Sequence, residues 1–232
     1  MTLQHWTKRL YLFIVFIFGW GSAAVSIATE NVIDPYLALI CGMSPLCAAL
    51  ITYMSQNPSS FLARIHFTFP HTYWWLGILL LPISFFAVLY ASYELTIPSI
   101  VWNPFFLTGV LLIVLCHEIG WRGFLHCAAP PHHFWRTSFL VGFASSCWHI
   151  PIWLIFFSVS NETLLIIACY LMLTAAPLSF VTIVSRSIVM TTILQTGLFL
   201  IMFVAITSTT MTFIMFSLLL ILNGIVMLLH NK

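Results

Sequence analysis

The amino-acid sequence predicts an all-α, polytopic membrane protein with about eight transmembrane helices. Of its 232 residues, 62% are hydrophobic and only 5% are charged, whereas a soluble domain carries about a quarter charged residues. The mean hydropathy is +1.09. Brief polar stretches divide the chain into apolar runs close to the roughly 20 residues that a membrane-spanning helix requires. We therefore expect a single integral membrane domain over residues 1–232.

The expected spans follow one another with short connections. In chain order they are 10–29, 34–54, 73–93, 103–121, 137–158, 162–183, 187–206 and 210–229. The two longest connections on the side of the termini are 55–72 and 122–136. In the second, Pro130 and Pro131 stop any helix. His126, His132 and His133, with the aromatic residues that follow, are typical of interfacial anchors or, as the alternative, of titratable surface histidines.

The first span has an alternative interpretation as a cleaved signal peptide. Lys8 and Arg9 precede its apolar run, and the small residues of 22–24 follow. The run is long enough to cross a bilayer and lacks a convincing cleavage site. We therefore expect it to be retained as a transmembrane helix.

The charged residues predict the topology. All seven basic residues fall on one side of the expected membrane: Lys8, Arg9, Arg64, Arg122, Arg136, Arg186 and Lys232. The connections on the other side carry Glu30, Asp34, Glu94 and Glu162 and no basic residue. The positive-inside rule then places both termini in the cytoplasm, and we expect a prokaryotic plasma membrane. Glu118 is the acidic residue that breaks the pattern.

Glu118 belongs to a polar cluster in the segment Leu115–His126, "LCHEIGWRGFLH". Glu118 and Arg122 are four residues apart, so they share a helix face and can pair, while His117 points about a third of a turn away. Ionisable groups at membrane depth are costly and are candidates for function. The alternative is an arginine that reaches the cytoplasmic interface with the glutamate as its counter-ion.

Two further polar residues lie in later spans. In "FASSCWHIPIW", His149 falls in the interior of the fifth expected span, and an antiparallel fourth span can bring Glu118 to face it. In the seventh span, Gln195 is a polar residue in an apolar setting. Each alone can be a side chain that hydrogen-bonds across helices. Together they predict a site, in which Glu118, Arg122, His149 and Gln195 line a cavity toward the cytoplasmic side.

At these residues the chain resembles the CPBP family of glutamic intramembrane proteases, also called the CAAX-protease or Abi family. The family pattern is EExxxR on one helix, FxxxH on the next and HxxxN or HxxxD near the end, and the resemblance covers residues 103–205. It implies a CPBP-like helical bundle and a protease in which the first Glu activates water and the two His stabilise the oxyanion. It implies no metal and no cofactor.

The match to the pattern is uneven. Glu118 corresponds to the second Glu, Arg122 to the Arg, and His149 to the His of the second motif. Four positions depart from the pattern, with His117 for the first Glu, Ser145 for the Phe, Gln195 for the third-motif His, and Phe199 for its Asn or Asp. The fold is thus better supported than the chemistry.

These departures predict a weakened site with His117 as the base. General acid–base help is worth roughly 10²–10⁴-fold and one oxyanion donor about 10²–10³-fold. Neutral imidazole can take a proton from water, and the Gln195 amide can still donate a hydrogen bond. A carboxylate paired with Arg122 is a weaker base than one in an apolar pocket, so Glu118 is expected to orient its neighbours.

Other chemistries have less support. His117, Glu118 and His149 can be considered as metal ligands, but the HExxH zinc motif needs a histidine where Trp121 stands. Cys116 and Cys147 adjoin the two histidines, and Ser145 lies one helical turn from His149. Closeness in sequence does not give a nucleophile its attack geometry.

Two functions remain from the sequence. The first is a CPBP-type endopeptidase that cleaves membrane-associated or prenylated peptides, and the second is an inactive relative that binds such a peptide or a membrane protein partner. A transporter is disfavoured because the second half does not echo the first as an inverted repeat. Membrane lipids are the expected surroundings. The net charge of +2 does not predict a nucleic acid partner.

Overall fold

The structure, a computed structural model, describes residues 3–29, 35–54, 103–126, 133–156, 158–206 and 208–230, and these are helical apart from short connections. The elements are α1 (Leu3–Ala28), α2 (Pro35–Met54), α5 (Pro104–Glu118), η2 (Ile119–His126), α6 (Phe134–Pro151), η4 (Ile152–Phe156), α7 (Asn161–Ser185), α8 (Ile188–Ala205) and α9 (Thr209–His230). The two η segments are π-helical continuations of α5 and α6. The described part of the chain contains no strand, as the all-α prediction requires.

Six of the described helical segments are long and apolar enough to cross a bilayer. They are Trp6–Ala28, Tyr36–Tyr53, Pro104–His126, Phe134–Ile155, Asn161–Ser185 and Thr209–His230. The chain is therefore a multi-pass membrane protein. The expected span 187–206 corresponds to α8, whose apolar part, Ile188–Phe203, is shorter. The expected span 73–93 lies outside the described residues, so the count of eight stays a prediction.

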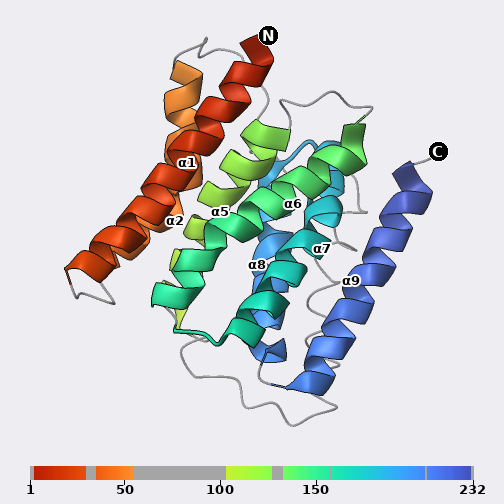
Figure 1. The fold of residues 1–232 in the computed structure, drawn as a ribbon. Helices are drawn as coiled ribbons and strands as arrows, with labels where there is room; N and C mark the ends of the chain where they lie inside the picture. The colour runs from red at the N-terminus through yellow and green to blue at the C-terminus, as the bar shows by residue number, and fades with distance from the viewer. Residues whose placement is uncertain are drawn as a thin grey trace.

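The helices form a bundle with both described chain ends at the same end of the molecule (Figure 1). The start of α1, the start of α6, the α7–α8 connection and the end of α9 lie at this end, and the start of α7 lies at the opposite one. The end of the bundle that contains the chain ends carries Lys8, Arg9, Arg136 and Arg186, and the opposite end carries Glu162 at the start of α7. This separation follows the charge pattern of the sequence; which end faces the cytoplasm stays a prediction.

Local sequence signals explain where several helices begin and end. Asn103 caps α5 by accepting a hydrogen bond from the Phe105 amide at 2.9 Å, and Ser160 caps α7 by accepting one from the Thr163 amide at 3.2 Å. Such side chains satisfy amides that have no partner in the first turn. Arg186 ends α7 with a left-handed backbone, φ 51°, so α8 can return antiparallel to α7.

The predicted C-terminal boundary of the fourth span, residue 121, was wrong. Helical structure continues beyond residue 121 through η2 to His126, so the connection predicted from residue 122 begins at least five residues later than expected. His126 is buried rather than interfacial, and its Nε2 lies 3.3 Å from the Ser138 hydroxyl of α6. Tertiary packing explains the burial of His126, because a buried surface on α6 supplies a polar partner that the sequence pattern did not reveal.

Two buried apolar clusters hold the bundle together. One joins α1, α2, η2 and α6, with Tyr11, Trp121 and Trp148 among its wholly buried side chains. The other joins η4, α7, α8 and α9, around Tyr170 and Met202. Because Tyr11 belongs to the first cluster, α1 is an integral part of the packed bundle. The site described below lies between the two clusters.

Gly120 permits the closest approach of η2 to α2. A Cβ atom at this position would lie 2.6 Å from both the carbonyl oxygen and the Cβ of Pro45.

Gly120→Ala is therefore expected to destabilise the protein by about 1–3 kcal/mol through overpacking. Thermal unfolding in detergent measures this change. Gly109→Ala is the control, since nothing lies within 4 Å of its added Cβ and a helical Gly→Ala change alone stabilises by roughly 0.5–1 kcal/mol. An equal response of both variants would contradict the close packing.

Candidate functional site

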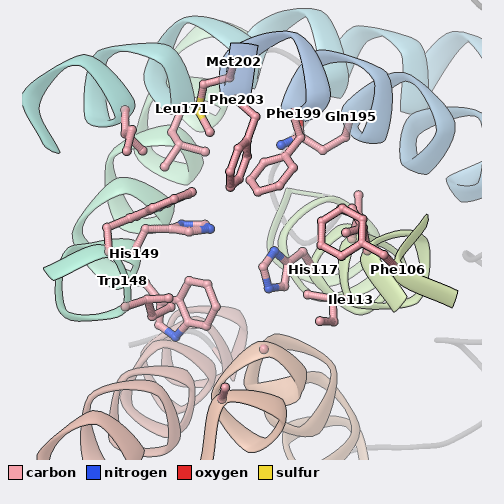
Figure 2. A pocket seen from close by; sticks show the side chains of 17 residues that line it. Phe106, Ile113, His117, Trp148, His149, Leu171, Gln195, Phe199, Met202 and Phe203 are labelled. Carbon is pink, nitrogen blue, oxygen red and sulfur yellow. The ribbon is translucent and has the colours of Figure 1, made fainter. Parts of the chain in front are cut away.

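A cavity of about 340 Å³ lies inside the bundle, lined by residues of α2, α5, α6, η4, α7 and α8. Most of its wall is apolar or aromatic, as Figure 2 shows for Phe106, Leu171, Met202 and Phe203. The polar exceptions are His117, His149 and Gln195, together with two tryptophans. Among the described residues, charged side chains are absent from this lining. The cavity therefore suits an uncharged, mainly apolar group that makes a few hydrogen bonds.

His149 points from the end of α6 into this cavity (Figure 2). Its Nδ1 lies 2.7 Å from the carbonyl oxygen of Ser145, one turn earlier. A carbonyl only accepts hydrogen bonds, so Nδ1 carries the proton and donates it. In the neutral ring this leaves Nε2 as the acceptor. The backbone of α6 thus orients His149 as a base toward the cavity.

His117 enters the same cavity from α5, opposite His149 (Figure 2). The centroids of the two imidazole rings are 5.5 Å apart and the rings are nearly perpendicular, at 84°. The Nε2 atom of His117 is buried and has no hydrogen-bond partner among the described residues. A buried ring nitrogen needs a partner, so His117 is available to hold a ligand or a water molecule at the cavity wall.

Gln195 reaches the cavity from α8, on the side away from α1 and α2 (Figure 2). Only 8% of its surface is exposed, and its Oε1 atom has no hydrogen-bond partner in the described part of the chain. An amide offers two donors and an acceptor. Gln195 can therefore accept from, or donate to, a polar group held near the two imidazoles.

Glu118 and Arg122 do not line this cavity, so the expectation that they face His149 there does not hold. They form the predicted i, i+4 ion pair, with Arg122 donating from Nη1 to Oε1 of Glu118 at 2.9 Å. Glu118 is wholly buried and Arg122 is 4% exposed. Successive helical residues differ in direction by about 100°. When His117 faces the cavity, Glu118 consequently points away from it and pairs with Arg122.

Trp148 lines the cavity, although the sequence did not identify it as a site residue. Its ring centroid lies 4.9 Å from that of His117 and 4.6 Å from that of His149, edge to face with both. Its indole N–H donates to the Ser44 hydroxyl of α2 at 3.1 Å. Trp148 therefore fixes the spacing of the two histidines. Its position next to His149 in the sequence was the available signal.

Two alternative chemistries can be compared with this geometry. Within the described ranges, no group of three or more His, Cys, Asp or Glu side chains is arranged to hold a metal ion. The Ser145 hydroxyl lies 3.5 Å from Nδ1 of His149, but that nitrogen already donates to the Ser145 carbonyl. Nδ1 is thus unable to act as a base for Ser145, and a serine nucleophile at this position is disfavoured.

Comparison with known proteins adds no assignment. No family model and no curated protein matches the chain. Functional inference therefore depends on the residues that line the cavity and on their geometry.

Proposed function

We propose that this protein is an intramembrane endopeptidase of the CPBP type, with a weakened, histidine-based site. One observation carries the proposal: positions 117, 149, 195 and 199, where the family pattern places its catalytic groups, all line the same cavity. These positions come from three separate helical segments. Their convergence is what a shared catalytic ancestry would produce, although three of the four residues differ from the pattern.

In the proposed reaction, a water molecule is held at Nε2 of His149. Nε2 of His149, the acceptor, takes a proton as the water oxygen adds to the peptide carbonyl carbon. The Gln195 amide donates to the oxyanion that develops, and the imidazolium returns the proton to the leaving amine nitrogen as the C–N bond breaks. Atoms and charge balance without a metal or a cofactor.

The cavity wall indicates the substrate class. Its apolar and aromatic residues, such as Phe106 and Leu171, exclude charged groups and favour an apolar peptide or a lipid-modified tail that enters from the bilayer. We place both termini in the cytoplasm on the basis of the one-sided arginines and lysines, and we propose a prokaryotic plasma membrane as the location. Membrane lipids and a membrane-associated or prenylated peptide are the proposed partners.

A second function, peptide or partner binding without cleavage, is favoured by a different observation. Among the residues that the structure describes, the cavity lining contains no carboxylate, and Glu118 pairs with Arg122 instead. Phe199 also stands where the pattern has an Asn or Asp. Loss of these groups removes a strong base and an orienting amide, while the apolar lining that would hold a ligand is kept.

Replacement of His149 separates the two functions. We expect His149→Ala to lower cleavage of a membrane-associated peptide by about 10²-fold or more, since it removes the proposed base. Cleavage is measured in proteoliposomes by mass spectrometry of the products. His133→Ala is the matched control because His133 is exposed near the start of the same helix. If unmodified protein binds the peptide but neither it nor the control cleaves it, the binding function is correct.

A further inference from the structure

A second group of polar side chains lies behind the cavity, and the proposed reaction does not use it. This buried polar cluster consists of Tyr11 of α1, Glu118 of α5, Trp121 and Arg122 of η2, and Tyr170 of α7. Each is buried and has a side-chain atom without a hydrogen-bond partner among the described residues: Tyr11 Oη, Glu118 Oε2, Trp121 Nε1, Arg122 Nε and Tyr170 Oη.

These five side chains are close in space. Glu118 and Arg122 form the 2.9 Å ion pair, and the rings of Tyr11 and Trp121 meet edge to face with centroids 5.8 Å apart. Tyr11 and Tyr170 each lie within electrostatic range of both members of the ion pair. Polar groups contributed by three parts of the bundle thus lie within electrostatic range of one ion pair or pack beside it.

The chemistry of the cluster identifies its ligand. Buried polar groups in native proteins are almost always hydrogen-bonded to protein or to ordered water. The cluster is electrically balanced, because Glu118 and Arg122 neutralise each other, so an ion is not required. It offers an acceptor on Glu118 and donors on Trp121 and Arg122. A small neutral molecule that both donates and accepts satisfies this set, and water does so.

We infer that the buried polar cluster binds ordered water molecules and supplies the cavity with the water used in hydrolysis. His117 and His149, which line the cavity, each lie within electrostatic range of Arg122, so the cluster lies close to the cavity wall. The water-binding part follows from the cluster alone. The supply part rests on the proposed peptidase function.

Radiolytic footprinting tests the water-binding part. A synchrotron X-ray pulse converts bound water to hydroxyl radicals, which oxidise the side chains that touch it. In protein reconstituted in nanodiscs, we expect Tyr11 and Trp121 to be labelled severalfold faster than Met211 and Met215, after correction for intrinsic reactivity. These methionines are 1% exposed and belong to an apolar cluster. Labelling of Tyr11 and Trp121 at or below the methionine level would overturn the inference.

Tyr170→Phe tests whether the cluster and the cavity are linked. This change removes one hydroxyl and keeps the ring, and we expect severalfold slower labelling of Trp121. Cleavage by the same variant should lose kcat severalfold with KM unchanged. Tyr36→Phe, at a side chain that is 76% exposed, should alter neither the labelling rate of Trp121 nor kcat. Unchanged Trp121 labelling in Tyr170→Phe would remove Tyr170 from the water site. If no variant cleaves while Trp121 is labelled, the water site stands and only the supply role fails.

Discussion

Arg122→Ala is expected to destabilise the folded protein by about 3–5 kcal/mol, because it leaves the Glu118 carboxylate buried without its counter-ion. Glu118 is wholly buried, and Arg122 donates to it at 2.9 Å. Few single substitutions have so large an effect. Reversible unfolding in mixed micelles, followed by tryptophan fluorescence, measures the change in the free energy of unfolding.

Two comparisons make this prediction specific. Arg136→Ala removes an exposed arginine and is expected to change stability by no more than about 0.5 kcal/mol. Glu118→Leu combined with Arg122→Leu removes both charges and should cost less than the sum of the single changes. If Arg122→Ala and Arg136→Ala were equally mild, the ion pair would have no structural role. For the same reason, loss of activity in Glu118→Gln would report on folding as well as on chemistry.

Rebuilding the family's catalytic groups is expected to raise peptidase activity. His117→Glu places a carboxylate on the cavity wall, and Gln195→His restores the histidine of the third motif. A general base contributes roughly 10²–10⁴-fold and one oxyanion donor about 10²–10³-fold. We therefore expect the double variant to cleave at least about 10²-fold faster than the unmodified protein. Cleavage of a prenylated or membrane-associated peptide in matched proteoliposomes is the measurement.

The two changes should reinforce each other. Groups that act on one reaction as a unit are not additive, so the double variant is expected to exceed the product of the single effects. Adding His149→Ala to the double variant is the control and should abolish the gain. Strong cleavage by the unmodified protein that falls on His117→Glu would show that His117 itself takes part in the reaction and that the carboxylate of the family pattern cannot replace it. Absence of cleavage in every correctly folded variant would favour the binding function.

Several features could be predicted from the sequence because they depend on local properties of the chain. The apolar runs predicted the described helices, since backbone groups in a bilayer must be satisfied within the helix. The spacing of Glu118 and Arg122 predicted their pairing, because i and i+4 share a helix face. His149 and Gln195 could be identified as site candidates because polar groups within a span are costly.

Tertiary structure decided which of these residues share the cavity. Sequence alone did not determine how far the helix continues past residue 121, or that His117, rather than Glu118, faces His149. The rotation of α5 about its axis is set by close contacts with α2, where Gly42 faces Ile113 and Gly120 faces Pro45. One residue corresponds to about 100° of rotation, so the packing directs His117 to the cavity and Glu118 to the ion pair behind it. A local pattern specifies the faces of a helix, but only its packed neighbours determine which face meets the site.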